Sequence, residues 1–217
     1  MNINLTLFGN TPSIRVVNAC RDLALGKAVV LIDDPDRENE GDLIVAAERI
    51  SEATMAQLIK DCSGIVCLTL TDEKIKQLQL SQMVSNNNSK NQTAFTVSIE
   101  AKQGVTTGVS AHDRVQTIKT AIAENAKPED LARPGHVFPL KSESGGVLSR
   151  RGHTEGSTDL CKLAGLSPYG VLCELMHSDG TMMKGQALVD YALANKLVLL
   201  TIEDIVSVIS ERKSKVA

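Results

Sequence analysis

Short apolar runs recur along the chain and alternate with longer segments of mixed polarity. Each run is too short for a buried helix and is rich in Val, Ile and Leu, which is typical of a β-strand. Residues 94–100 instead alternate between apolar and polar positions, which predicts a half-exposed strand. The expected buried strands are 28–32, 43–47, 64–70, 169–175 and 197–202.

The segments between these runs predict helices. Thr11 and Pro12 form a helix start, with Thr as N-cap and Pro at the first helical position, and Gly26 supplies the stop. Residues 127–152 contain several Pro and Gly residues and are expected to form loops. The other helices are expected at 51–61, from 71, at 111–124, 154–164 and 185–196, and from 203.

Strands that alternate with helices, without a shift in composition or an internal repeat, predict one domain spanning residues 1–217. Two strands flank residues 33–42 like a hairpin, so the sheet should contain antiparallel as well as parallel pairs. Aromatic residues make up only 2% of the chain and Trp is absent, so the core should be aliphatic. The predicted fold class is α+β, a single three-layer α/β/α domain with a mixed β-sheet.

Charge and composition exclude several classes of function. The formal net charge is −3, so the chain lacks the basic surface that binding to a nucleic-acid backbone requires. No apolar run approaches the ~18 residues of a membrane span, and the first residues lack the pattern of a signal peptide. The five cysteines include no C-x-x-C pair, which favours reduced thiols. We therefore expect a cytoplasmic protein that binds neither nucleic acid nor membrane.

Carboxylates are concentrated between the first two predicted strands. Six of the ten residues 33–42 are acidic, against 26 of 217 in the whole chain. Such a cluster is unfavourable unless a cation offsets the repulsion, and Mg²⁺ prefers oxygen ligands. Arg37, the one basic residue of the segment, could neutralise these acids or bind a phosphate. A solvated turn and a site for metal or substrate both remain open on this pattern.

Two histidines lie in segments with unusual backbone requirements. Residues 133–139 place His136 between two prolines, where an imidazole could serve as a general acid or base, or could be incidental. His153 belongs to the segment 150–155 (Arg-Arg-Gly-His-Thr-Glu), which leads into a predicted helix. The free N–H groups at a helix start bind anions, so the segment predicts a phosphate site, with His153 contacting metal or phosphate. Thr154 could alternatively act only as the helix cap.

Three further positions are less specific. Residues 106–110 precede another predicted helix and could bind an anion, although capping by Ser110 explains them nearly as well. Glu174 ends an apolar strand, where a carboxylate is costly unless it is paired, functional or facing outward. Cys67 lies inside a strand and is expected to pack in the core.

Six sequence blocks stand out in combination: D-D-P-D-R-E-N-E-G-D (33–42), S-G-I-V-C (63–67), G-V-T-T-G-V-S-A-x-D-R (104–114), R-P-G-H-V-F-P-L (133–140), G-G-V-L-x-R-x-G-H-T-E (145–155) and G-V-L-C-E-L (170–175). Together and in this order they resemble the 3,4-dihydroxy-2-butanone 4-phosphate synthase family of riboflavin biosynthesis. The blocks cover nearly the whole chain, which makes the resemblance specific.

The resemblance implies a three-layer fold, a homodimer and a reaction. Members of the family are lyases that convert D-ribulose 5-phosphate to L-3,4-dihydroxy-2-butanone 4-phosphate and formate, through a metal-stabilised enediolate and a skeletal rearrangement. It also implies Mg²⁺ as cofactor, with Mn²⁺ as an alternative ion, and active sites shared between the two chains of the homodimer. Many relatives carry an additional GTP cyclohydrolase II-type domain; this sequence has none, so only the first activity is expected.

The resemblance also implies residue roles, carried over by motif. Glu38 and His153 match the Mg²⁺ ligands, and His136 and Glu174 match residues essential for catalysis. Glu40, Cys67 and Thr107 fall near the family site without a defined role. Arg151 occupies a variable position, so Arg150 is the expected phosphate ligand. The full set of expected substrate-binding residues is Arg37, Glu38, Asp42, Arg150, Arg151, Gly152, His153, Thr154 and Glu174.

Two other interpretations compete with this one. Another Mg²⁺-dependent sugar-phosphate isomerase or aldolase would use similar residues and the same enediolate chemistry, but only the synthase releases formate. A nucleotide- or RNA-binding module would require a basic face, which the acidic segment and negative net charge oppose.

Overall fold

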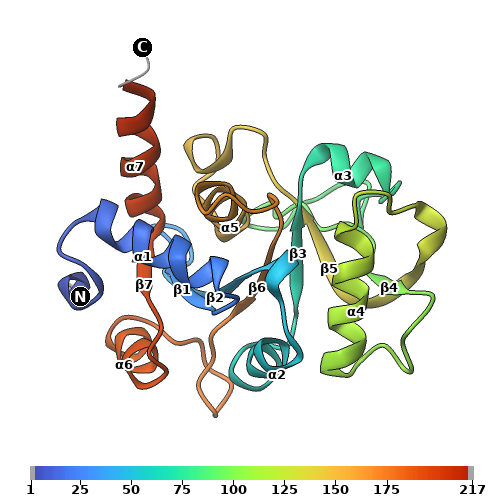
Figure 1. Ribbon diagram of the computed structural model, residues 1–217, viewed down its shortest axis with the longest axis horizontal. Coiled ribbons are helices and arrows are strands. Elements are labelled where there is room, and N and C mark those ends of the chain that lie inside the picture. Colours follow the sequence, from blue (N-terminus) through green and yellow to red (C-terminus); the bar gives the residue numbers. More distant parts are fainter. Residues whose placement is uncertain (1–2, 215–217) are drawn as a thin grey trace.

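The computed structural model of the chain describes residues 3–214. At its centre lies a seven-stranded sheet with the strand order β4-β5-β3-β6-β2-β1-β7 (Figure 1). The strands are β1 (Val29–Ile32), β2 (Gly41–Ala46), β3 (Cys67–Leu70), β4 (Ile99–Ala101), β5 (Leu131–Lys141), β6 (Gly170–Glu174) and β7 (Leu199–Thr201).

Both parallel and antiparallel pairs occur in this sheet. β1 and β2 form an antiparallel hairpin in which Val29 lies opposite Ile44 and Ile32 lies opposite Gly41. β6 is antiparallel to β2 and to β3, whereas β3 with β5 and β1 with β7 are parallel pairs. The predictions of a mixed sheet and of a hairpin around residues 33–42 are therefore confirmed.

Helices cover both faces of the sheet (Figure 1). Side chains of α1, α5 and α7 pack against one set of strand residues, such as Leu31 and Ile44. Those of α2, α4 and α6 pack against residues that alternate with them, such as Leu43 and Val45. The three-layer α/β/α prediction is confirmed. The helices are α1 (Pro12–Ala24), α2 (Glu52–Asp61), α3 (Asp72–Gln77), α4 (Ala111–Ile122), α5 (His153–Leu163), α6 (Gln186–Ala194) and α7 (Ile202–Ser214).

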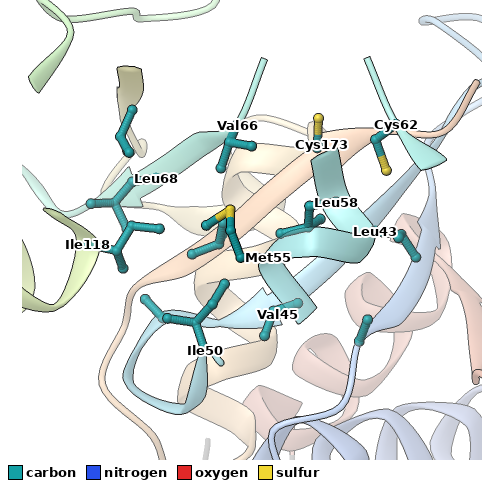
Figure 2. Close-up of a cluster of buried hydrophobic side chains, with 14 of the residues drawn as sticks. Leu43, Val45, Ile50, Met55, Leu58, Cys62, Val66, Leu68, Ile118 and Cys173 are labelled. Atoms are coloured by element: carbon teal, nitrogen blue, oxygen red, sulfur yellow. The ribbon is translucent and has the colours of Figure 1, made fainter. Parts of the chain in front are cut away.

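The core is aliphatic, as the composition predicts. Figure 2 shows the part of it in which Met55 and Leu58 of α2 lie over Leu43, Val45 and Leu68 of the sheet. All five side chains are completely buried. Burying one such side chain contributes about 2 kcal/mol, so this layer is a main source of the stability of the fold.

Polar side chains fix the starts of the helices. Thr11 accepts a hydrogen bond from the Ile14 N–H at 3.3 Å, which confirms it as the N-cap of α1. Ser51 and Thr54 form a reciprocal capping box at the start of α2. Gly26, with φ of 76°, follows the end of α1 as expected. Within residues 3–214, no helix combines the length and the apolar character needed to cross a bilayer.

The prediction that residues 127–152 form only loops is wrong, because β5 occupies residues 131–141. The sequence does not suggest a strand there because Pro134 and Pro139 cannot donate to a ladder. The fold tolerates Pro134 because it lies where the register of the pairing between β5 and the short strand β4 shifts, between Ala132 and Val137. Pro139 still contributes an acceptor, since its carbonyl oxygen receives the Thr96 N–H at 3.0 Å.

The predicted strand 94–100 is only partly present. Continuous pairing is confined to β4 at residues 99–101. Phe95 forms an isolated bridge to Leu140, and Thr96 forms one to Gln82. The period-two pattern therefore marks an extended segment at the sheet edge that pairs through isolated bridges and not through a regular ladder.

Helix α5 packs unusually close to the sheet. Residues 153–161 are all buried. A Cβ at Gly156 would lie 2.6 Å from Leu31 Cδ2 and 2.5 Å from Ile202 Cδ1, so a larger residue would force these buried side chains to shift. The Ser157 and Thr69 hydroxyls, 3.0 Å apart, hydrogen-bond between the helix and β3. The first residues of α5 are consequently held in a fixed position over the ends of β2 and β6.

Candidate active site

The acidic segment forms a closed turn between β1 and β2. Asp33 is buried directly after β1 and accepts hydrogen bonds from the backbone N–H groups of Glu38 (3.1 Å) and Glu40 (2.9 Å). Asn39, which lies between them, has φ of 54°, in the left-handed region that Asn tolerates better than most residues. Lys184 Nζ donates to the carbonyl oxygen of Glu38 at 2.9 Å. The segment is therefore held on two sides and is not a freely solvated turn.

This turn places Glu38 beside His153, the first residue of α5. The His153 Nδ1 atom lies 3.7 Å from Glu38 Oε2 and 3.5 Å from Asp42 Oδ1. Candidate ligand atoms of Asp33, Glu38 and His153 all lie within 4.8 Å of one another. The two residues expected to bind Mg²⁺ thus lie close enough to share one ion.

A pocket of about 150 Å³ opens at this cluster. Asp42 and Glu174 face each other across the β2–β6 pair, which brings two strand-borne carboxyls to its wall. Cys67 is also in the wall, although it is almost fully buried, as expected of a core residue. The residues lining the pocket are Arg37, Glu38, Asp42, Cys67, Thr93, Phe95, Leu140, His153, Thr154, Leu172 and Glu174.

Two buried polar atoms of this pocket have no hydrogen-bond partner within the part of the chain that the structure describes. They are Nε2 of His153 and Oδ1 of Asp42. Buried polar atoms are nearly always paired in folded proteins, and each exception requires an explanation. An imidazole nitrogen and carboxylate oxygens around a small polar pocket fit the needs of a divalent cation. The residues present therefore suit the expected metal.

The clustered charges shift the proton affinities of these groups. The imidazole of His153, together with the Arg37 guanidinium, lowers the pKa of Glu38 to about 2. Burial alone would lower the pKa of His153, but the carboxyls of Asp42 and Glu38 raise it to about 9. Burial also raises the pKa of Asp42 well above its usual range. In this cluster the carboxyl groups outnumber the one imidazole. A divalent cation could therefore take the place of the proton that His153 holds.

The start of α5 forms another wall of the pocket. Gly152 is the N-cap, so Thr154 lies in the first turn and is not the cap. His153 and Thr154 both line the pocket, and the positive end of the helix dipole therefore adjoins it. This geometry would suit an anion, and the anion site at residues 150–155 stays a prediction.

The two arginines before α5 have different surroundings. Arg150 donates to Glu155 Oε2 at 2.7 Å and to the Thr93 hydroxyl at 3.3 Å, and Thr93 lines the pocket. Arg151 instead donates to both oxygens of Asp34, at 2.5 and 2.8 Å, and to Glu203 at 2.7 Å. Neither arginine is itself part of the pocket wall, but Arg150 contacts a wall residue, whereas Arg151 is engaged by two carboxylates.

Glu174 does not face outward, because its side chain lies in the pocket and receives a hydrogen bond. The Ser63 hydroxyl donates to Glu174 Oε2 at 2.6 Å. Ser63 follows α2, and its backbone N–H donates to the Glu174 carbonyl oxygen at 2.8 Å. The loop after α2 therefore fixes both the backbone and the carboxylate of Glu174.

His136 lies outside this pocket. It is part of β5, its side chain is 45% exposed, and its Nδ1 lies 2.5 Å from Glu100 Oε2. The structure therefore does not bring His136 together with Glu174 within one copy of the chain. Thr107 is likewise exposed and away from the pocket wall.

The second candidate anion site, residues 106–110, is occupied by a side chain of the protein itself. The Asp113 carboxylate accepts the N–H groups of Thr106 (3.1 Å) and Gly108 (3.0 Å). Ser110 accepts the Asp113 N–H at 3.0 Å and caps α4. Capping, the simpler interpretation, accounts for the segment.

Several site residues are not predicted from the sequence. Asn91 donates to Glu38 Oε1 at 2.5 Å, and its only signal is its place in the polar segment 85–92. Ser63 contacts Glu174, and Asp33 contacts the backbone of the acidic turn. The first two contacts join residues that are distant in sequence, and the third depends on the shape of a turn. The amino-acid pattern of the chain does not indicate contacts of either kind.

Comparison with known proteins agrees with this geometry. The family model described as 3,4-dihydroxy-2-butanone 4-phosphate synthase matches residues 17–208. The chain belongs to this family. A 3,4-dihydroxy-2-butanone 4-phosphate synthase from Shewanella pealeana is 64% identical over 203 residues, covering 94% of this chain and 95% of that protein. The synthase from Desulforamulus reducens is 58% identical over 213 residues, covering 98% of each.

Solved structures of the same family share the fold. A 3,4-dihydroxy-2-butanone 4-phosphate synthase crystallised in complex with two magnesium ions superposes with a TM-score of 0.88 at 38% identity, covering 91% of this chain and 97% of that one. A two-domain synthase from A. baumannii gives a TM-score of 0.84 at 44% identity, covering 88% of this chain and 56% of that one. The α+β fold and the family are thus established together.

Proposed function

We propose that this chain is a Mg²⁺-dependent lyase of riboflavin biosynthesis that converts D-ribulose 5-phosphate to L-3,4-dihydroxy-2-butanone 4-phosphate and formate. The observation that carries the proposal is the convergence of Glu38, Asp42, His153 and Glu174 on one pocket in a chain of this family. The chain acts as one domain, and its five free thiols suit a cytoplasmic location.

Glu38 and His153 are the residues that would hold the ion. Their ligand atoms are close together, and the unpaired Nε2 of His153 supports this assignment. Bound Mg²⁺, or Mn²⁺ in its place, would stabilise negative charge on adjacent oxygens of the sugar. Asn91 and Arg37 each contact one carboxylate oxygen of Glu38, at 2.5 Å, and orient that side chain.

The phosphate of the substrate binds at the start of α5. The helix dipole and the N–H groups of the first turn favour an anion there, with Gly152 and Thr154 at the helix start. Arg150 is the arginine that we assign to this site, because it contacts Thr93 of the pocket wall and pairs with one carboxylate, whereas Arg151 pairs with two. The sugar then extends from the phosphate toward the carboxylates.

Asp42 and Glu174 contact the hydroxyl groups of the sugar from the sheet side. Burial raises the pKa of Asp42, so this carboxyl can hold a proton, whereas Glu174 accepts a hydrogen bond from Ser63. Of two neighbouring carboxyl groups in different environments, one can act as a general acid and the other as a general base. Glu174 is the residue we assign to proton transfer from within the chain.

His136 performs its catalytic role in the site of a second copy of the chain. It lies outside its own pocket and is exposed, while Glu100 holds its ring. Apolar side chains are exposed on neighbouring segments: Val109 (47%) follows Gly108, which lies against Glu100, and Ile65 (48%) precedes Val66, whose carbonyl oxygen accepts the Phe138 N–H. A homodimer that covers this surface would bring the partner subunit's His136 to the pocket.

The reaction is tested by incubating the protein with ribulose 5-phosphate and Mg²⁺ and measuring formate. Formate and the four-carbon phosphate should appear in equal amounts, stop after chelation and resume when Mg²⁺ is added. Glu38→Gln should reduce turnover by orders of magnitude, whereas Asp36→Asn, in the same turn but exposed, should not. Sugar turnover without formate would instead indicate an isomerase or aldolase, and undiminished turnover without metal would contradict the metal assignment.

The shared site is tested with two inactive variants, His136→Gln and Glu174→Gln. If each site takes these two residues from different chains, a mixed dimer contains one site with both residues intact. Mixing the variants under conditions of subunit exchange should therefore restore activity. A mixture that stays inactive although mixed dimers have formed would show that both residues act within one chain.

A further inference from the structure

Asp33 is the most enclosed carboxylate of the acidic turn. Its side chain is completely inaccessible to solvent. Three donors converge on it: the Glu38 N–H at 3.1 Å, the Glu40 N–H at 2.9 Å and Arg37 Nη1 at 2.9 Å. Its own N–H donates to the Glu40 carbonyl oxygen at 3.3 Å, so Asp33 and Glu40 are joined in both directions.

These contacts use both oxygens of the carboxylate. Oδ1 accepts the Glu40 N–H, and Oδ2 accepts the Glu38 N–H and Arg37. Asp33 is absent from the pocket wall, and the unpaired buried atoms of the site belong to His153 and Asp42. Proximity to Glu38 and His153 therefore does not by itself make Asp33 a ligand.

We propose that Asp33 is a positioning residue, which folds the acidic turn so that Glu38 points at the metal, and that it does not bind the metal itself. This inference rests on the proposed function, because it assigns Glu38 to the ion. The carboxylate sets the backbone on both sides of Asn39 and, through Arg37, also holds the side chain of Glu38, whose Oε2 lies 2.5 Å from Arg37 Nη1. The hydrogen bonds of Asp33 should thus give the turn its shape without a bound ion.

A carboxylate is required at this position because all three partners are donors. Asn has nearly the same size but only one acceptor oxygen, and its amide N–H₂ would face donors. Asp33→Asn should therefore loosen the turn without creating a cavity. Asp36→Asn is the matched control, because it makes the same chemical change in the same turn at an exposed position.

The decisive measurement is amide hydrogen exchange in metal-free protein, followed by NMR. In the wild type, the Glu38 and Glu40 amides should be protected. In Asp33→Asn their exchange should accelerate at least about tenfold, while the amides of β1 and β2 keep their protection. Asp36→Asn should match the wild type. A merely structural role would instead accelerate exchange throughout both strands.

Metal titration supplies the second measurement. Mg²⁺ affinity, measured by calorimetry, should fall in Asp33→Asn, and raised Mg²⁺ should restore its turnover but not that of Glu38→Gln. Unchanged protection of Glu38 and Glu40 in Asp33→Asn, with Mg²⁺ binding lost, would overturn the proposal and make Asp33 a ligand. If Asp33→Asn does not fold, the wild type still tests the proposal. Rapid exchange of the Glu38 and Glu40 amides in the metal-free wild type would contradict it. The exchange data require neither ion nor sugar, so they stand even if the chain acts on a different substrate.

Discussion

The charge on His153 makes the stability of the metal-free protein depend on pH. Its pKa in the folded chain is raised to about 9 by the surrounding carboxyls, against an ordinary value near 6.5 in the unfolded chain. Because the folded state binds this proton more tightly, the stabilisation is fully present below pH ~6.5 and is lost as the pH rises through about 9.

The magnitude follows from the shift in pKa. A shift from 6.5 to about 9 corresponds to about 3 kcal/mol, of which about 2 kcal/mol is lost between pH 6.5 and 8.5. His153 is only 5% exposed, so solvent screening reduces this figure little. For a protein of this size, a loss of about 2 kcal/mol lowers the melting temperature by roughly 4–8 °C.

The assay is urea or thermal unfolding in the presence of a chelator, at one protein concentration and several pH values. His153→Asn should lack most of the loss between pH 6.5 and 8.5, whereas His177→Asn, outside the pocket, should behave like the wild type. Saturating Mg²⁺ should stabilise the wild type more at pH 8.5 than at pH 6.5, since metal binding requires the neutral imidazole. The reasoning is refuted if the wild type and His153→Asn lose stability in parallel.

Two further predictions concern Ser63 and Leu58. Ser63→Ala removes the 2.6 Å hydrogen bond to Glu174 and should lower kcat about 10- to 100-fold with less effect on KM, as a hydrogen bond to a charged group contributes about 1.5–3 kcal/mol. Ser63→Thr should recover much of the loss, and steady-state formate release is the readout; equal kcat in all three proteins would show that Ser63 does not position Glu174. Leu58→Ala empties a fully buried position under the sheet and should cost about 2–5 kcal/mol in urea unfolding at unchanged KM. A cost below ~1 kcal/mol would mean that the layer in Figure 2 repacks freely.

The fold is largely predictable from the sequence because most strands are continuous aliphatic runs and most helices carry their own caps. Thr11 and Ser51 cap helices in the structure as their positions suggest. β5 is missed because Pro134 and Pro139 oppose strand formation locally, while its pairing with β3 is decided by the tertiary structure.

The candidate site is predictable only where its residues form a motif. Glu38 and His153 each lie in a distinctive segment, and the structure brings the two segments together. The contact between Ser63 and Glu174 spans 111 positions of sequence, and that between Asn91 and Glu38 spans 53. Neither residue type is unusual where it occurs, so only the folded chain identifies them as neighbours of functional groups.

Because α5 packs closely against the sheet at Gly156, one part of the site is rigid, while another part can adjust its conformation. Close packing beneath the helix at this position opposes sliding and rotation, so we expect the imidazole and the helix start to keep nearly the same geometry when ligands bind. Adjustment to a sugar of changing shape must then come from the β1–β2 turn and from the chain around Asn91, which touch that helix only through side chains. Substitutions that alter the preferred ion or sugar should accordingly accumulate in those two segments, while a side chain at position 156 should destabilise the protein by displacing Leu31 and Ile202.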